Sequence, residues 1–148
     1  MIRKFEQKDL EEVMKIWLNT NIQAHNFIPD SYWRDNFEAV QSMIPEADVY
    51  IYESNGKVIG FVGIKAGYLA GIFVSQDMQS SGIGKQLLDK AKELYPDLSL
   101  SVYKKNKKAI DFYIREMFVV EKVQVDEDTG EEEYYMIWKG KYIKKDPL

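Results

Sequence analysis

The sequence predicts an α/β (α+β) fold with a mixed, mostly antiparallel central β-sheet flanked by helices. Three apolar, β-rich runs follow one another at 49–52, 58–64 and 68–74, and short polar breaks join them. Two other segments, 10–18 and 83–95, carry apolar residues at helical spacing with polar residues between them. Strands joined by tight turns pair antiparallel, and amphipathic helices cover the faces of such a sheet.

Composition limits both the domain organisation and the classes of partner. With 148 residues, 45% of them hydrophobic and 30% charged, the chain fits one core, which we expect over residues 1–140, followed by a solvated tail at 141–148. The net charge of −4 gives no general attraction to nucleic acids or anionic membranes. The absence of cysteine excludes disulfides and zinc–thiolate sites, and we expect no metal. No signal-like or 18-residue apolar run is present, so we expect a cytoplasmic monomer or homodimer.

The N-terminal half is expected to contain a short strand and two helices. We predict a strand over 2–5, then a helix that Asp9 caps and that carries its apolar face as far as Leu18. The mixed stretch 19–30 is predicted to be a loop. Ser31 is predicted to cap a second helix that Pro45 ends.

The rest of the chain alternates strands and helices. Asn55-Gly56 suits a tight hairpin turn, and 68–74 is predicted to be a buried strand. The remaining predicted elements are a helix from Ile83 to Pro96, a strand at 98–102, a short helix from Asn106 to about Arg115, and a hairpin of 118–125 and 133–138 around the acidic turn 126–130.

The segment from Val74 to Lys85 is the most informative part of the sequence. It leads from a strand through a polar loop into an amphipathic helix, whose N-terminal N–H groups favour an anion, and Gly82 and Gly84 leave room for one. An ordinary strand-to-helix turn is the alternative. Gln86 and Leu87 exclude the nucleoside triphosphatase loop and the dinucleotide fingerprint, so neither ATP nor NAD is favoured.

Two motifs here resemble those of a known family. Gln79-x-x-Gly82-x-Gly84 resembles the Gln/Arg-x-x-Gly-x-Gly/Ala signature with which GNAT acetyltransferases hold the pyrophosphate of coenzyme A. A downstream segment from Leu100 to Tyr113 resembles a second family segment. The chain is therefore similar to small, single-domain bacterial GNAT enzymes. This resemblance implies an N-acetyltransferase with acetyl-CoA as donor substrate and an amine as acceptor.

The resemblance also assigns roles to residues. It implies that the backbone of Ile72, Phe73 and Val74 contacts the pantetheine arm of coenzyme A. It implies that the pyrophosphate is surrounded by Gln79, Ser80, Ser81, Gly82, Ile83, Gly84 and Lys85. Asn106, beside Ala109, would contact pantetheine or adjacent backbone, or serve as a helix cap alone. Tyr113 matches the general acid that protonates the departing thiolate, with a core tyrosine as the alternative. Where the family often has Gly, Met117 either ends the helix differently or carries a conformational cost.

The general base and the acceptor stay open at this point. A lysine-type amine must lose a proton before it attacks, yet 68–74 contains no carboxylate. Candidates are Tyr68, His25, Glu53 or a water chain, and a wall of His25, Phe27, Trp33 and Tyr68 is expected to bind the acceptor. The acidic balance favours a cationic acceptor, and the sequence does not select among a small molecule, a peptide and a protein lysine.

Two other functions are consistent with the same sequence. One is a non-catalytic acetyl-CoA sensor that keeps the phosphate site. The other is an interaction module on the same fold, with Trp17, Trp33 and Trp138 partly exposed in a contact surface. The presence of Tyr113 at the position of the acid favours the enzyme.

Overall fold

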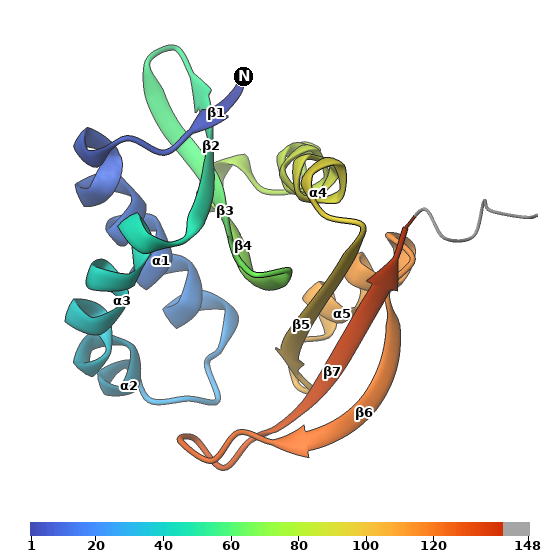
Figure 1. Ribbon diagram of the computed structural model, residues 1–148. Coiled ribbons are helices and arrows are strands. Elements are labelled where there is room, and N and C mark those ends of the chain that lie inside the picture. Colours follow the sequence, from blue (N-terminus) through green and yellow to red (C-terminus); the bar gives the residue numbers. More distant parts are fainter. Residues whose placement is uncertain (141–148) are drawn as a thin grey trace, which may run out of the picture.

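Seven strands form one sheet in the order β1-β2-β3-β4-β5-β7-β6 in the computed structural model, which describes residues 1–140 (Figure 1). The strands are β1 (Ile2–Lys4), β2 (Asp48–Ser54), β3 (Lys57–Lys65), β4 (Tyr68–Val74), β5 (Asp97–Tyr103), β6 (Val119–Val125) and β7 (Glu132–Lys139). The helices are α1 (Leu10–Ala24), α2 (Asp30–Asp35), α3 (Phe37–Met43), α4 (Ile83–Leu94) and α5 (Lys107–Arg115), with short 3-10 turns η1 (Gln7–Asp9), η2 (Ile44–Glu46) and η3 (Gln76–Met78). The predicted α+β class with a mixed, mostly antiparallel sheet is confirmed. The predicted tail, 141–148, lies outside the described residues.

The sheet divides between β4 and β5. All other neighbouring strands pair antiparallel, and β3 stays paired with β4 as far as Gly60 opposite Val74. The parallel register of β4 and β5 contains, among residues 1–140, the single pair Tyr68 and Ser99. Beyond Tyr68 the two strands diverge, which Figure 1 shows as an opening between β4 and β5. One edge of β4 is thus left without a partner strand in the described part of the chain.

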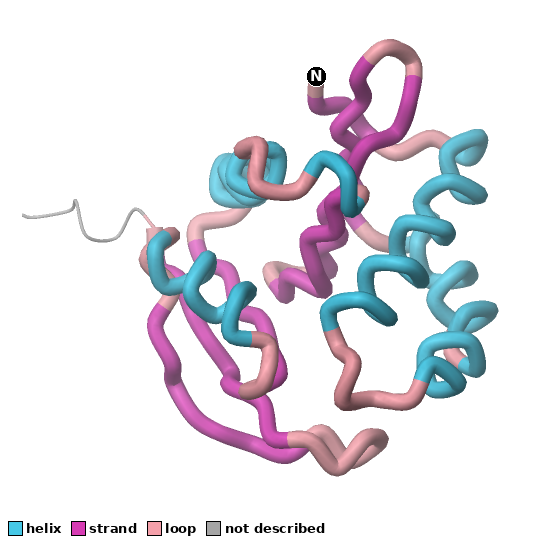
Figure 2. Tube along the Cα trace, turned by 180° about the vertical axis from the view of Figure 1, so that it is seen from behind, coloured by secondary structure: helices cyan, strands magenta, loops and turns pink. Residues whose placement is uncertain are grey.

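Two groups of buried side chains cover the two faces of the sheet. On one face, Leu87 and Leu88 of α4 and Tyr113 of α5 pack in one core with β3, β4, β5 and β7. On the other face, Trp17 of α1 and Trp33 of α2 pack over β2 and β3. In Figure 2, α5 crosses β5–β7, whereas α1, α2 and α3 lie beside β1–β4. Helix α4 therefore belongs to a core that spans the opening.

The interaction-module alternative required exposed tryptophans. That expectation is wrong for Trp17 and Trp33, each 8% exposed, because their rings meet edge to face at 5.9 Å within the core. Trp138 is half-buried, with the ammonium of Lys92 5.1 Å from its ring centre.

The N-terminal helices differ from their predicted bounds. Stretch 19–30 is not all loop, because α1 continues to Ala24; the buried Asn21 amide donates to the Trp17 carbonyl at 3.0 Å and so fits within the helix. The predicted helix from Ser31 is two helices, which begin at Asp30 and Phe37 and are separated at Asn36. Asn36 has φ −94° and ψ 0°, outside the usual helical values, and its amide donates to the Tyr32 carbonyl at 2.7 Å.

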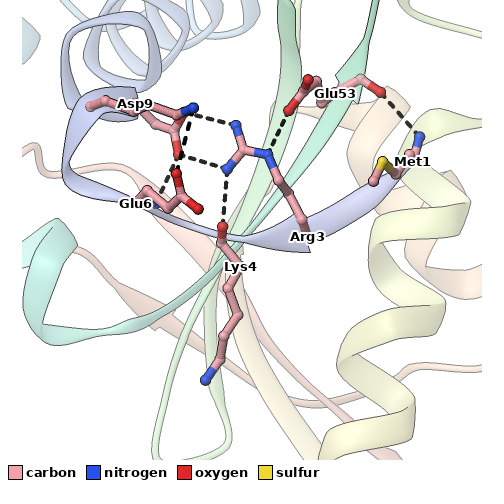
Figure 3. A network of polar contacts seen from close by, with 7 residues as sticks. Met1, Arg3, Lys4, Glu6, Asp9 and Glu53 are labelled. Carbon is pink, nitrogen blue, oxygen red and sulfur yellow. Dashed lines mark hydrogen bonds and ion pairs between the residues drawn. The ribbon is translucent and has the colours of Figure 1, made fainter. Parts of the chain in front are cut away.

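Asp9 has a different role from the predicted cap of α1. Its carboxylate makes no capping bond to α1; it accepts the Glu6 N–H at 2.8 Å and two bonds from the Arg3 guanidinium at 2.9 Å (Figure 3). Arg3 also donates to Glu53 at 2.5 Å. The side-chain hydrogen bond from Arg3 lowers the pKa of Asp9. This network joins β1, η1 and β2.

The structure also differs from the predictions at strand β4 and at the end of α5. β4 was predicted to be buried, yet Tyr68 is 40% exposed and Ala70 is exposed, and beyond Tyr68 the strand no longer pairs with β5. At the end of α5, Met117 adopts a left-handed φ of +76°, and the Phe118 N–H bonds the Tyr113 carbonyl at 3.0 Å. The helix thus ends as a glycine-type cap would, with the conformational cost that a side chain adds there. Within residues 1–140, no helix is long and apolar enough to cross a membrane.

Candidate functional site

A cleft of about 1120 Å³ occupies the opening between β4 and β5. Its walls come from α1, α2, β4, the loop before α4, β5, α5 and the turn between β6 and β7. Ligand pockets commonly measure about 300–1,000 Å³, so this cleft can hold a large cofactor together with part of an acceptor. The predicted site residues that line it are His25, Trp33, Tyr68, Ile72, Phe73, Val74, Gln79, Ser80, Gly82, Gly84, Lys85, Asn106, Ala109 and Tyr113.

One end of the cleft is built from backbone amides at the start of α4. Ser80 and Gly82 have left-handed φ values of +66° and +87°, a backbone form in which successive N–H groups converge on an anion. Gly82 is the N-cap of α4, and within residues 1–140 no side chain caps this N-terminus, so its first N–H groups are free to bind a ligand. A Cβ at Gly82 would have nothing within 4 Å. The residues present therefore fit a phosphate group.

Side chains around these amides hold the loop in shape. The Gln79 amide donates to the Val74 carbonyl at 2.9 Å, and the Ser81 hydroxyl donates to the Met78 carbonyl. The Lys85 ammonium lies 3.2 Å from Glu116 and 3.5 Å from Asp89, and the hydrogen bond to Glu116 raises the pKa of Lys85. Lys85 thus adds a permanent positive charge at this end, partly balanced by two carboxylates.

Three predicted contacts do not line the cleft with their side chains. Ile83 is 4% exposed and belongs to the core under α4, so it can offer the cleft its backbone N–H alone. Ser81 is turned to Met78. Phe27 lies edge to face against His25, with ring centres 5.7 Å apart, packs against the core of α1 and α2, and is not among the residues that line the cleft.

Tyr113 of α5 lines the cleft. Its ring is 8% exposed and meets Phe112 and Phe118 edge to face at 5.2 and 5.5 Å. Burial raises the pKa of Tyr113, and Tyr68 raises it further. The phenol therefore keeps its proton at neutral pH and is able to donate it.

His25 and Asn106 both line the cleft, and their side chains contact each other. The His25 ring is stacked on Trp33 with centres 5.2 Å apart and meets Tyr103 edge to face at 5.2 Å. Asn106 caps α5, because its Oδ1 accepts the Ala109 N–H at 3.3 Å. Its Nδ2 lies 3.2 Å from His25 Nε2. Burial lowers the pKa of His25 to about 4, so the imidazole is neutral at pH 7.

The other end of the cleft is acidic and aromatic. Asp126 and Asp128 of the β6–β7 turn and Glu133 of β7 line it together with Tyr32 and Tyr103. The Tyr103 hydroxyl donates to Asp126 at 2.6 Å. Burial is the main cause that raises the pKa of Tyr103, and this hydrogen bond raises it further. Sequence reasoning missed this group. The acidic turn was visible in the sequence, but its position next to α2, about a hundred residues earlier, was not.

Two expectations about other groups can be placed geometrically. Glu53, one base candidate, lines a separate hollow with Arg3 and Asp9 and is not among the residues of the cleft. Within residues 1–140, no group of three or more His, Cys, Asp or Glu side chains is arranged to hold a metal ion.

Comparisons with known proteins agree with this geometry. The family model described as "Acetyltransferase (GNAT) family" matches residues 10–117. Peptidyl-lysine N-acetyltransferase YiaC of Escherichia coli K12 is 34% identical over 140 residues, which cover 93% of this chain and 96% of the relative. Peptidyl-lysine N-acetyltransferase YjaB of the same organism is 25% identical over 87% of this chain and 88% of its own.

Structural similarity adds to the sequence matches. The solution structure of apo-form YjaB from Escherichia coli superposes with a TM-score of 0.82 at 24% identity, and covers 95% of this chain and 97% of that one. The GCN5-related N-acetyltransferase structure from Rhodopseudomonas palustris also gives a TM-score of 0.82, over 94% of both chains at 14% identity. These two similarities concern the fold. Together with the sequence matches and the amide-lined cleft, they establish that the chain belongs to the GNAT family of acetyl-CoA-dependent N-acetyltransferases.

Proposed function

We propose that this enzyme acetylates the ε-amino group of lysine residues in peptides or proteins. The relatives at 34% and 25% identity carry that activity in their names. The observation in this chain that supports it most is the opposite character of the two ends of the cleft. One end has free amides and Lys85, and the other has Asp126, Asp128 and Glu133.

The amide-lined end suits the pyrophosphate of acetyl-CoA. Amides at a helix N-terminus and a left-handed glycine allow phosphate oxygens to approach the backbone closely. The unpaired edge of β4 after Tyr68 offers N–H and C=O groups to the amide-containing pantetheine arm. Ser80, Gly82 and Gly84 are the contacts that we assign to the pyrophosphate.

The acidic end suits a lysine side chain. Three carboxylates attract an ammonium group, and the rings of Tyr32 and Tyr103 can pack along its methylene groups. A lysine amine with a pKa of about 10.4 must lose a proton before it attacks. In the proposed reaction this proton passes to the carboxylate end, directly or through water, in place of the carboxylate that β4 lacks.

Acetyl-CoA supplies an acetyl group that is activated as a thioester. In the proposed reaction the lysine nitrogen forms a bond to the acetyl carbon and the bond from that carbon to sulfur breaks. Tyr113 donates its phenolic proton to the departing sulfur and regains one from water. Its raised pKa keeps the donor protonated at neutral pH. A thiol of pKa about 8.5 leaves fairly well unaided, so the acid contributes a moderate factor.

Peptide substrates test the acceptor class. The full chain is incubated with acetyl-CoA and a peptide that has one lysine and a blocked N-terminus, and coenzyme A thiol release is followed. The matched control has norleucine, which keeps the methylenes without the amine, and a third peptide has a free N-terminus but no lysine. We expect turnover with the lysine peptide alone. Turnover of the free N-terminus at an equal or greater rate contradicts the proposal.

A further inference from the structure

Three hydrogen bonds connect the end of α1 to the start of α5 across the cleft. His25 Nδ1 lies 3.1 Å from the Asn21 carbonyl oxygen, and His25 Nε2 lies 3.2 Å from Asn106 Nδ2. The other amide atom of Asn106, Oδ1, accepts the Ala109 N–H in the first turn of α5 at 3.3 Å. His25 and Asn106 thus each use two different side-chain atoms for their two hydrogen bonds.

The donor and acceptor roles in this series follow from its two ends. Because Asn106 Oδ1 accepts from the Ala109 N–H, the atom facing His25 is Nδ2, which can donate but cannot accept. His25 Nε2 must therefore accept, and the ring proton is on Nδ1, where it is donated to the Asn21 carbonyl. Both ring nitrogens are engaged. A general base would need the Nε2 lone pair that Asn106 occupies.

The surroundings hold the imidazole in this orientation. Trp33 stacks on one face with an interplanar angle of 26°, and Tyr103 and Phe27 meet the ring edge to face. Trp33 comes from α2 and Tyr103 from β5, so the ring is held from both sides of the opening. Groups that are locked by packing can transmit a position to their hydrogen-bond partners.

Asn106 and Tyr113 are seven residues apart on the same helix, which is about two turns, so they share one face of α5. A shift of the first turn of α5 therefore moves the Tyr113 hydroxyl within the cleft. We infer that His25 is a positioning residue that fixes the first turn of α5 through Asn106 and so sets the place of Tyr113. This inference rests on the proposed function for the role of Tyr113, whereas the link to α5 itself is independent of activity.

Two substitutions at His25 separate positioning from base catalysis. His25→Phe keeps an aromatic ring between Trp33 and Tyr103 and removes both hydrogen bonds. His25→Gln provides a carbonyl oxygen, at about the reach of Nε2, that can accept from Asn106 but cannot act as a base. We measure amide hydrogen exchange at Ala109, and kcat/KM for the lysine peptide as a function of pH.

For a positioning residue, His25→Phe should speed exchange at Ala109 about tenfold and lower kcat/KM about tenfold, the size of one lost hydrogen bond. His25→Gln should return both to within about threefold of the wild-type values, with the limbs of the pH profile unmoved. The inference is overturned if Gln and Phe both lose about 10²-fold or more and the acidic limb disappears, as for a lost base. Unchanged exchange at Ala109 in His25→Phe overturns it as well, even if no peptide is turned over.

Discussion

Replacing Gly82 by valine tests the amide-lined end of the cleft most directly. Gly82 has a φ of +87°, where a side chain costs about 1–2 kcal/mol, and a β-branched one is the least tolerated. Its added Cβ meets nothing within 4 Å, so no clash adds to that cost. For a chain of this size we expect the melting temperature to fall by about 3–8 °C. The protein should still fold.

The effect of Gly82→Val on acetyl-CoA binding should be larger than its effect on stability. The valine methyl groups would fill the space that lets phosphate oxygens approach the first N–H groups of α4. Hydrogen bonds to charged groups contribute about 1.5–3 kcal/mol each. Losing one or two of them weakens binding by about 10²-fold, or about 2.8 kcal/mol. Isothermal titration calorimetry with acetyl-CoA measures this loss directly.

Gly56→Val is the matched control for this experiment. Gly56 also has a left-handed φ, +75°, and open space around its Cβ position, but it lies in the turn between β2 and β3, outside the cleft. It should lose similar stability and keep wild-type affinity for acetyl-CoA. Wild-type affinity in Gly82→Val would refute the assigned phosphate position. Equal losses of affinity in both variants would show that binding follows stability and not the amides.

Two further predictions concern Tyr113 and Asp9. Tyr113→Phe should lower kcat by about 10²-fold, in the lower half of the range for a positioned acid, with acetyl-CoA affinity and melting temperature nearly unchanged; a wild-type kcat on the true acceptor would make Tyr113 a packing residue. Asp9→Asn should cost about 2 kcal/mol at pH 7, because it removes a charged partner of Arg3. The pKa of Asp9 is lowered in the folded state, so the extra stability of the wild type is present above pH about 4 and is lost as the pH falls further. The free energies of unfolding of the wild type and Asp9→Asn, measured as a function of pH, should therefore converge in acid. A constant difference between them down to pH about 2 would contradict this.

The sequence allowed the elements of the phosphate end to be predicted, because their signals are local. The strand at 68–74, the Gly82-x-Gly84 turn and the amphipathic helix 83–94 are adjacent in the chain, and each has its own period or turn residue. The same holds for Asn106, whose predicted cap is confirmed. Helix bounds were wrong where a polar residue is buried inside α1, as at Asn21, and where the backbone bends between α2 and α3, as at Asn36.

At the acceptor end, His25 and Trp33 were predicted and line the cleft, but the carboxylates and the orientation of His25 could not be predicted, because they depend on tertiary contacts. Asp126 accepts a hydrogen bond from Tyr103, and the Asp128 N–H donates to Asp126; sequence periodicity does not indicate such bonds. The orientation of His25 likewise depends on Trp33 and Asn106, which arrive from different elements. β4 was expected to be buried because its residues are apolar. That composition reflects the face of the strand that packs on the core, and it does not indicate that a partner strand is missing along one edge.

The continuous core beneath α4 has a consequence for the kinetics of binding. Leu87 and Leu88 are fully buried in a cluster that includes side chains of β3 and β4 on one side of the opening and of β5 and β7 on the other. The two groups of strands therefore cannot move toward or away from each other without disrupting this core. A site that is already shaped in the free protein loses little conformational entropy when a ligand arrives, and most of that loss is borne by the flexible ligand. Acetyl-CoA should then associate in one concentration-dependent step, without a slow phase for rearrangement of the protein.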